Sequence, residues 1–128
     1  MADSHYSAHE LGQGQIRVIW ILPDEEHKPI RCRMATVPLD GDHIALSYVW
    51  GTDEAIHCIE VNGRPFYIRE NLYDFLNHAR TIHFGEFLWI DAICINQKDN
   101  EERNHQVRQM DSIYRSARVV VSLSLIHI

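Results

Sequence analysis

The chain has 128 residues, enough for one domain with a hydrophobic core. Hydrophobic residues make up 45% and charged residues 23%, which is typical of a globular protein and excludes a disordered or fibrous one. A formal charge of -6 repels phosphate backbones, and the basic stretches 64–69 and 115–118 hold only two arginines each. We therefore expect no nucleic-acid partner.

The cysteines and the first residues indicate the cellular environment. Cys32, Cys58 and Cys94 are odd in number and far apart, which argues against a secreted disulfide scaffold. Residues 1–10 lack the basic and apolar layout of a signal peptide, and no apolar run is long enough to cross a bilayer. The sequence predicts a soluble cytoplasmic protein. The nine histidines are scattered, so we expect no metal site.

The first half of the chain is rich in strand signals. After a polar segment, 1–14, that we interpret as a flexible leader, the stretches 16–22 and 30–39 are predicted to pair as a hairpin. The run 44–50 is nearly continuous in apolar residues, which is typical of a strand buried on both faces. Asn62-Gly63 then predicts a tight two-residue turn between two further strands.

The second half alternates helices with short apolar segments. Asn71 is a candidate N-cap for a helix whose apolar residues recur at helical spacing, at Leu72, Phe75, Leu76 and Ala79. The run 87–90 predicts a strand that ends at Asp91. Asp99 and Glu102 have the spacing of a capping box, in which the aspartate caps free amides and the glutamate reaches back. The helix that follows has an apolar stripe at Val107, Met110, Tyr114 and Ala117.

A third apolar strand begins at Val119. The order strand, helix, strand, helix, strand predicts an α/β fold: a short parallel sheet with flanking helices and right-handed crossovers. The Asn62-Gly63 hairpin is then an insertion in the first crossover. We expect one domain over residues 15–128.

Four blocks in this order resemble the fungal heterokaryon incompatibility (HET) domain: residues 45–51, 68–72, 88–97, and Glu102-Arg103 through Gln106-Val107, Met110 and Ile113-Tyr114. The resemblance implies a protein of vegetative incompatibility, in which fusion of genetically different hyphae triggers death of the mixed cell. It also implies a distant similarity to Toll/interleukin-receptor-like domains. Such a similarity implies a flavodoxin-like sheet, and some members of that wider group cleave NAD.

The end of the chain departs from the family pattern. Where a Trp-Leu-Gly-type ending and a long further region are expected, residues 122–128 follow and the chain stops. We interpret the chain as the N-terminal portion of a HET domain whose C-terminal part is truncated. A natural short protein that ends in a strand is the alternative.

The candidate site lies where the parallel strands end, because open α/β sheets bind ligands outside the carboxyl ends of their strands. The candidate ligand-binding residues there are Tyr48, Trp50, Gly51, Asn96 and Gln97. Trp50 could stack on a base, and the two amides could bond an amide or a sugar. The alternative is that each of these residues serves the structure alone.

Any catalytic role would fall to carboxylates at the same end. Asp91 and Glu54, with Asp53 beside Glu54, are the candidates for stabilising the oxocarbenium ion that forms when NAD is cleaved. Cys94 could be a nucleophile, but a buried structural cysteine is commoner. Arg103 and Gln106 are expected to tie their helix to the preceding loop.

No complete catalytic set emerges, so the sequence leaves enzymatic activity open. Three hypotheses follow: a signalling module that self-associates or binds a protein partner, an enzyme that hydrolyses NAD or a related nucleotide, and a truncated product without function. We expect no cofactor, with NAD as the candidate substrate of the second hypothesis.

Overall fold

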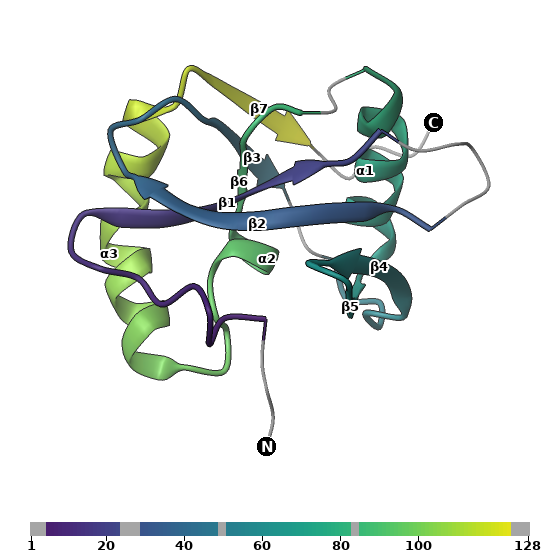
Figure 1. Cartoon of the computed structure of the whole chain (residues 1–128), viewed down its shortest axis with the longest axis horizontal. Helices are drawn as coiled ribbons and strands as arrows, with labels where there is room; N and C mark the ends of the chain where they lie inside the picture. Colours follow the sequence, from purple (N-terminus) through teal and green to yellow (C-terminus); the bar gives the residue numbers. More distant parts are fainter. Residues whose placement is uncertain (1–4, 24–28, 49–50, 83–84, 124–128) are drawn as a thin grey trace.

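A computed structural model of the chain describes residues 5–23, 29–48, 51–82 and 85–123 (Figure 1). Within these ranges the fold is α/β, with one mixed seven-stranded sheet in the order β5-β4-β2-β1-β6-β3-β7. The strands are β1 (Gln15–Ile21), β2 (Arg31–Pro38), β3 (Ile44–Tyr48), β4 (His57–Val61), β5 (Arg64–Ile68), β6 (Leu88–Ile90) and β7 (Val119–Leu123). The helices are α1 (Glu70–Ile82), α2 (Asp91–Cys94) and α3 (Asn100–Ser116).

Three strands at one end of the sheet run parallel, as the sequence predicts. β3 pairs with β6 on one side, from Ile44↔Leu88 to Leu46↔Ile90, and with β7 on the other. Ala45, Leu46, Trp89 and Ile90 are each at most 1% exposed, which is why these segments have no polar face in the sequence. The carboxyl ends of β3 and β6 are therefore neighbours.

The N-terminal hairpin is confirmed, and it joins the same sheet. β1 and β2 pair antiparallel from Gln15↔Pro38 to Ile21↔Cys32, and β1 pairs antiparallel with β6 at Ile19↔Leu88. Because β1 runs against β6, the beginning of β1 lies at the carboxyl end of the parallel strands. This placement brings Arg17 to that end.

The inserted hairpin is also confirmed. Asn62 and Gly63 have φ angles of 52° and 81°, the left-handed pair that a tight turn needs. β4 and β5 pair antiparallel around this turn, and β4 continues the sheet by pairing parallel with β2. The insertion thus extends the sheet on the side away from the parallel strands.

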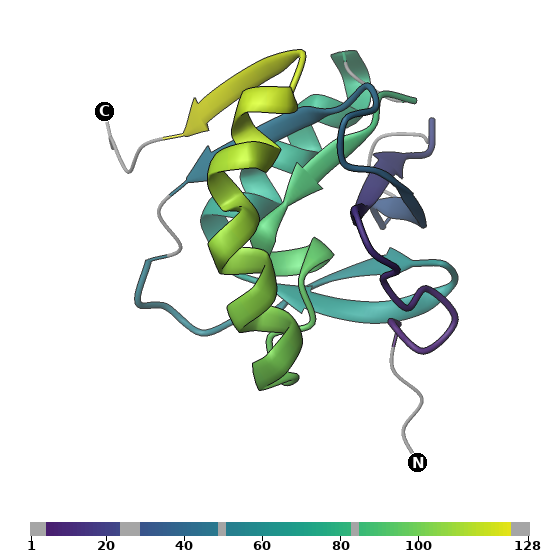
Figure 2. The ribbon, with the colours of Figure 1, turned by 90° about the vertical axis from the view of Figure 1, so that its left-hand side faces the viewer.

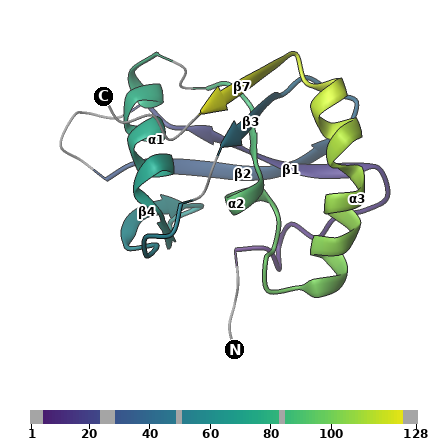
Figure 3. The same cartoon turned by 180° about the vertical axis from the view of Figure 1, so that it is seen from behind.

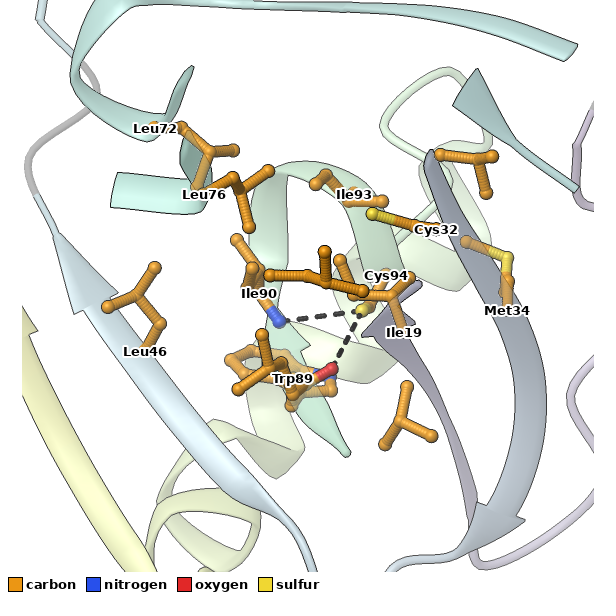
Figure 4. Close-up of a cluster of buried hydrophobic side chains, with 14 of the residues drawn as sticks. Ile19, Cys32, Met34, Leu46, Leu72, Leu76, Trp89, Ile90, Ile93 and Cys94 are labelled. Atoms are coloured by element: carbon orange, nitrogen blue, oxygen red, sulfur yellow. Dashed lines mark hydrogen bonds between the residues drawn. The ribbon is translucent and has the colours of Figure 1, made fainter. Parts of the chain in front are cut away.

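The long helices cover opposite faces of the parallel strands (Figures 2 and 3). Leu72 and Leu76 of α1 lie in one buried cluster with Leu46 and Ile90 (Figure 4). Trp89 points to the other face by strand alternation, and there its ring meets the Tyr114 ring of α3 edge-on, 5.6 Å between centroids. The connection from β3 to β6 and the connection from β6 to β7 run in opposite directions along the sheet. Crossovers of one hand that run in opposite directions place their helices on opposite faces.

The start of α1 differs from the prediction. The helix begins at Glu70, so Asn71 lies within its first turn and the prediction of an Asn71 cap was wrong. The cap comes from Asp53, whose Oδ2 accepts the Glu70 N–H at 3.1 Å. A carboxylate 17 residues away gives no local signal, so spacing rules could not have found it.

The face that α3 buries also differs. Val107 is 54% exposed, so its place in the predicted apolar stripe was wrong, whereas Gln106 and Ile113 are fully buried. The helix is rotated so that Glu102 and Gln106 face inward, because Glu102 pairs with a buried arginine described below. No helix in the described residues is long and apolar enough to cross a membrane.

Candidate functional site at the carboxyl end of the parallel strands

A buried ion pair lies at this end of the sheet. The Arg17 guanidinium donates to both carboxylate oxygens of Glu102, Nη1 to Oε2 at 2.6 Å and Nη2 to Oε1 at 2.8 Å. The Arg17 side chain is 1% exposed and that of Glu102 is 14% exposed. A bidentate pair of this geometry is the strong form of the arginine–carboxylate interaction. It ties β1 to the first turn of α3.

The remaining donors and acceptors of the pair are also used. Arg17 Nε donates to the His9 carbonyl at 2.8 Å, and Nη1 donates to the Cys94 carbonyl at 3.1 Å. Glu102 Oε2 accepts the Asn96 N–H at 2.6 Å. We call Arg17, Glu102 and these hydrogen-bond partners the Arg17 lock. It holds together the N-terminal segment, β1, α2, the loop before α3 and α3 itself.

The lock explains why the capping box is only half formed. The Asp99 side chain caps α3 by accepting the Glu102 N–H at 3.2 Å, as predicted. The Glu102 carboxylate, however, bonds Arg17 and Asn96, so the prediction that it reaches back to cap the helix was wrong. A buried guanidinium attracts the carboxylate more strongly than a neutral amide does.

The segment for which we predict a flexible leader contacts this end of the sheet over part of its length. The Tyr6 hydroxyl donates to the Ile93 carbonyl at 2.7 Å, and its ring lies 4.7 Å from the Arg17 guanidinium carbon. Burial raises the pKa of Tyr6, and the nearby Cys94 adds to the rise, while Arg17 opposes it. Tyr6 therefore acts as a neutral donor.

Cys94 is a structural residue. It is fully buried, its Sγ accepts the Ile90 N–H at 3.4 Å, and it donates to the Leu88 carbonyl at 3.8 Å (Figure 4). Burial raises the pKa of this thiol to about 12. At neutral pH it stays protonated, which makes it a poor nucleophile.

Asp91 stands at the start of α2 and is half-buried. Its carbonyl accepts Gln97 Nε2 at 2.9 Å, so Gln97 braces the turn between β6 and α3. The pKa of Tyr114 is raised by burial and then by the charge of Asp91, against a hydrogen bond with Ser47. Asp91, Tyr114 and Ser47 thus gather where β3 and β6 end.

Asn96 turns to a different surface from Gln97. Its Oδ1 accepts the Lys98 N–H at 3.2 Å, and the residue lines a groove of about 740 Å³ between the N-terminal segment and the start of α3. The groove is acidic, with Glu10, Asp99 and Glu101 in its wall beside the paired Glu102. The side-chain amides of Asn96 and Gln97, both predicted to bind a ligand, therefore face different surroundings.

The loop after β3 holds the other candidates. Gly51 has a φ of 86°, which side chains rarely adopt, and Glu54 is exposed. Asp53 caps the start of α1 through its side chain, and its carbonyl accepts Arg69 Nε, just before that helix, at 2.8 Å. Tyr48 ends β3, but its side chain and the whole of Trp50 lie outside the described residues. A binding crevice formed by Trp50 and Asp91 stays a prediction.

Arg103 and Gln106 do not tie α3 to its loop in the way that was expected. The exposed Arg103 guanidinium donates to Asn100 of the same helix at 3.1 Å. Gln106 is fully buried, and among the described residues neither amide atom has a hydrogen-bond partner. Leaving a buried amide unpaired costs on the order of 1–3 kcal/mol.

Sequence reasoning missed Arg17, Tyr6 and Ser47, whereas Tyr114 packs against the core as its place in the apolar stripe predicts. A signal for Arg17 existed, since a charged residue inside the apolar run 16–21 needs a buried partner. Tyr6 and Ser47 carry no comparable signal. In the described part of the chain, no three histidine, cysteine or acidic residues are grouped so that they could hold a metal ion.

The fold and this site define an α/β domain in which a charged pair, Arg17 and Glu102, joins the N-terminal segment and the sheet to α3. The family model of the heterokaryon incompatibility protein (HET) matches residues 43–125. A curated relative, heterokaryon incompatibility protein 6, OR allele, of Neurospora crassa, is 43% identical over 105 residues, which cover 70% of this chain and 15% of the relative.

The chain belongs to the HET family. It spans about 15% of the length of that Neurospora relative. No solved structure matches it.

Proposed function

We propose that this chain is a signalling domain of vegetative incompatibility, which triggers cell death in fungi when non-self is recognised. The observation that carries the proposal is the family match over residues 43–125. The curated relative is itself described as a heterokaryon incompatibility protein. We further propose that the domain acts by contact with proteins, either a partner or a second copy.

The bonding at the carboxyl end of the sheet supports contact rather than chemistry. Glu102 is held by Arg17, Asp53 caps α1, and the Cys94 thiol is protonated. Three of the polar or nucleophilic groups named in the sequence analysis, Glu102, Asp53 and Cys94, therefore have structural roles.

Expression from an inducible promoter in a filamentous fungus tests this function. We expect loss of viability within hours of induction, measured by exclusion of a vital dye. Arg103→Ala is the matched control, because the Arg103 side chain is exposed and its printed hydrogen bond goes to Asn100 of the same helix. It should kill as the unchanged chain does, whereas Arg17→Met should not. Normal growth of cells that accumulate the folded, unchanged protein would contradict the proposal.

A second candidate function is hydrolysis of NAD or a related nucleotide. Across the sheet the three parallel strands lie in the order β6, β3, β7, so the first of them in the sequence lies between the second and the third. Flavodoxin-like sheets begin with the same arrangement. This order supports the similarity to Toll/interleukin-receptor-like domains. It makes the ends of β3 and β6 neighbours, where Asp91 and Tyr114 gather and where a carboxylate could stabilise an oxocarbenium ion.

Release of nicotinamide from NAD by the purified chain distinguishes the two functions. Turnover that falls strongly in Asp91→Ala or Glu54→Ala would support the enzyme. If no turnover occurs, or if both variants leave it unchanged, this candidate function is removed.

The cysteines support a location in the cytoplasm. Cys32, Cys58 and Cys94 are all free thiols, which persist in a reducing compartment. Fluorescence microscopy of a tagged chain would test this location, and a signal confined to the secretory pathway would contradict it.

A further inference from the structure

Two histidines stand in the N-terminal segment, residues 5–14, where it lies against the domain. The His5 ring meets the Phe66 ring of β5 edge-on, with 5.0 Å between the centroids. The ring nitrogen Nε2 of His9 lies 3.0 Å from Nδ2 of Asn62, in the turn between β4 and β5. Histidine changes its charge between about pH 5 and 8, so both contacts contain a group that can respond to pH.

The hydrogen bonds of Asn62 determine where the His9 ring carries its proton. The backbone N–H of Met34 can only donate, and it lies 3.0 Å from Asn62 Oδ1, which must therefore be the oxygen of the amide. Asn62 Nδ2 then carries both hydrogens, and it donates to the Met34 carbonyl at 3.4 Å and to His9 Nε2. His9 Nε2 is an acceptor here, so the docked ring is neutral with its proton on Nδ1. A protonated ring would set two donors against each other.

His5 disfavours a charge for a different reason. Its Nε2 is buried and has no hydrogen-bond partner in the part of the chain that the structure describes. The Tyr6 ring beside it, 6.3 Å away between centroids, belongs to a neutral phenol. A protonated His5 ring would bury a charged N–H without an acceptor, which costs far more than leaving a neutral nitrogen unpaired. Docking and protonation of His5 therefore oppose each other.

The charged groups around the two rings do not reverse this preference. From β1, Arg17 donates to the His9 carbonyl, and its positive charge opposes a second one nearby. Its partner Glu102 is already held in the ion pair. Glu10, the next residue in the segment, and Arg64, which follows the turn, are exposed, so water and salt screen both charges. The start of α3 places its titratable side chains in the groove, whose lining includes neither histidine: Asp99, Glu101, Glu102 and His105.

We propose that residues 5–14 form a pH-sensitive strap, which stays docked while His5 and His9 are neutral and is released when they are protonated. The released segment binds protons that the docked segment excludes, so docking is favoured at neutral pH and is lost as the pH falls. Release breaks the bond from Arg17 to the His9 carbonyl and removes the Tyr6 ring from the guanidinium. It thereby exposes the Arg17 side chain, which is 1% exposed in the docked form. This device is a property of the fold and goes beyond the proposed signalling function.

The expected effect follows from the two protons. A histidine in a released segment titrates near about pH 6.5, so each excluded proton should raise the ratio of released to docked strap roughly tenfold between pH 7.5 and pH 5.5. The two histidines together should raise this ratio by up to about a hundredfold.

Hydrogen–deuterium exchange of the whole chain, followed by mass spectrometry, measures the release. The protection of amides in residues 5–14, corrected for the intrinsic exchange rate, should fall by up to about a hundredfold at pH 5.5, while α1 keeps its protection. His9→Gln keeps an acceptor for Asn62 and cannot be protonated, so its loss of protection should be about ten times smaller. His78→Gln is the matched control, because His78 is exposed on α1, and it should show the full loss.

A second variant covers the other histidine. His5→Phe keeps an aromatic ring against Phe66, and its combination with His9→Gln should keep the strap protected at both pH values. Circular dichroism at each pH shows whether a variant is folded, and His5→Phe alone, with about a tenfold smaller loss, replaces His9→Gln if the latter is not.

Equal protection of residues 5–14 at the two pH values overturns the proposal. So does a loss that persists in the folded double variant, since a group other than the two histidines would then control the strap. Neither result bears on the death assay, so the signalling function stands or falls separately.

Discussion

Two inward-facing polar side chains, the partly buried Glu102 and the fully buried Gln106, stand one turn apart on α3 and have opposite surroundings. The Glu102 carboxylate accepts hydrogen bonds from Arg17 through both oxygens and from the backbone N–H of Asn96. The side-chain amide of Gln106 has no partner in the described structure. The first is a charge whose cost of burial is offset by bonds, and the second is a neutral group whose cost is not. Burial alone therefore does not tell whether a polar residue stabilises this fold.

The largest effect is expected from removing Arg17, the hydrogen-bond partner of Glu102. Arg17→Met leaves the Glu102 carboxylate buried beside an apolar chain, and loss of one partner of a buried pair costs about 3–5 kcal/mol. Urea unfolding followed by circular dichroism measures the loss. The exposed pair of Arg115 and Asp111 gives the control, since Arg115→Met should change stability by less than about 1 kcal/mol.

Alkaline pH should lower the free energy of unfolding, because two cysteine thiols, Cys32 and Cys94, are buried in the core. Burial raises the pKa of Cys32 and of Cys94 from 9 to about 12. Below pH 9 both thiols are protonated in the folded and unfolded chain. Between pH 9 and 12 only the unfolded chain loses these protons, so stability falls by about 1.4 kcal/mol per pH unit for each thiol.

Cysteine variants isolate this effect. Urea midpoints at pH 7, 9 and 10.5 should show a smaller alkaline loss in Cys94→Ala than in the unchanged chain. Cys58→Ala should keep the full loss, because both buried thiols remain. An equal loss in all three proteins would show that other groups cause it.

Replacement of Gln106, whose amide has no hydrogen-bond partner in the described structure, should raise the stability of the fold. Gln106→Met removes the unpaired amide and keeps the volume of the side chain, so we expect a gain of about 1–2 kcal/mol in the free energy of unfolding. Thermal unfolding of the two proteins measures the change. Gln109→Met, at a less buried position on the same helix, should gain less. A clear loss of stability in Gln106→Met would mean that the amide has a partner in solution.

The smallest effect concerns the helix cap supplied by a distant loop. Asp53→Ala removes the acceptor of the Glu70 N–H, which should cost about 1 kcal/mol, and Asp53→Asn should recover most of it. Chemical denaturation measures both variants. Equal stability of the alanine variant and the unchanged chain would show that the cap contributes nothing.

The sequence was informative where a pattern is local. The apolar runs at β3, β6 and β7 predicted three parallel strands, and Asn62-Gly63 predicted the turn that the structure contains. It was silent where a contact joins distant segments. β1 meets β6 at a single residue pair, and Arg17 meets Glu102 across 85 residues. Such contacts depend on topology, which no short stretch of sequence encodes.

The candidate site shows the same limit. Asp91, Cys94, Asn96 and Gln97 do lie together at the end of β6, as their closeness in the chain requires. Their directions could not be predicted, because the Arg17 lock turns Asn96 toward the N-terminal groove while Gln97 braces the Asp91 carbonyl. The predicted contribution of Trp50 lies outside the described residues.

The central claim is that Arg17 and Glu102 act as a unit that joins the N-terminal segment to the HET blocks. A double-mutant cycle with Arg17→Met, Glu102→Gln and the combined variant measures this coupling directly. We predict a coupling free energy of at least about 2 kcal/mol, with the double variant much less destabilised than the two single changes added together. Strict additivity of the two changes would contradict the account.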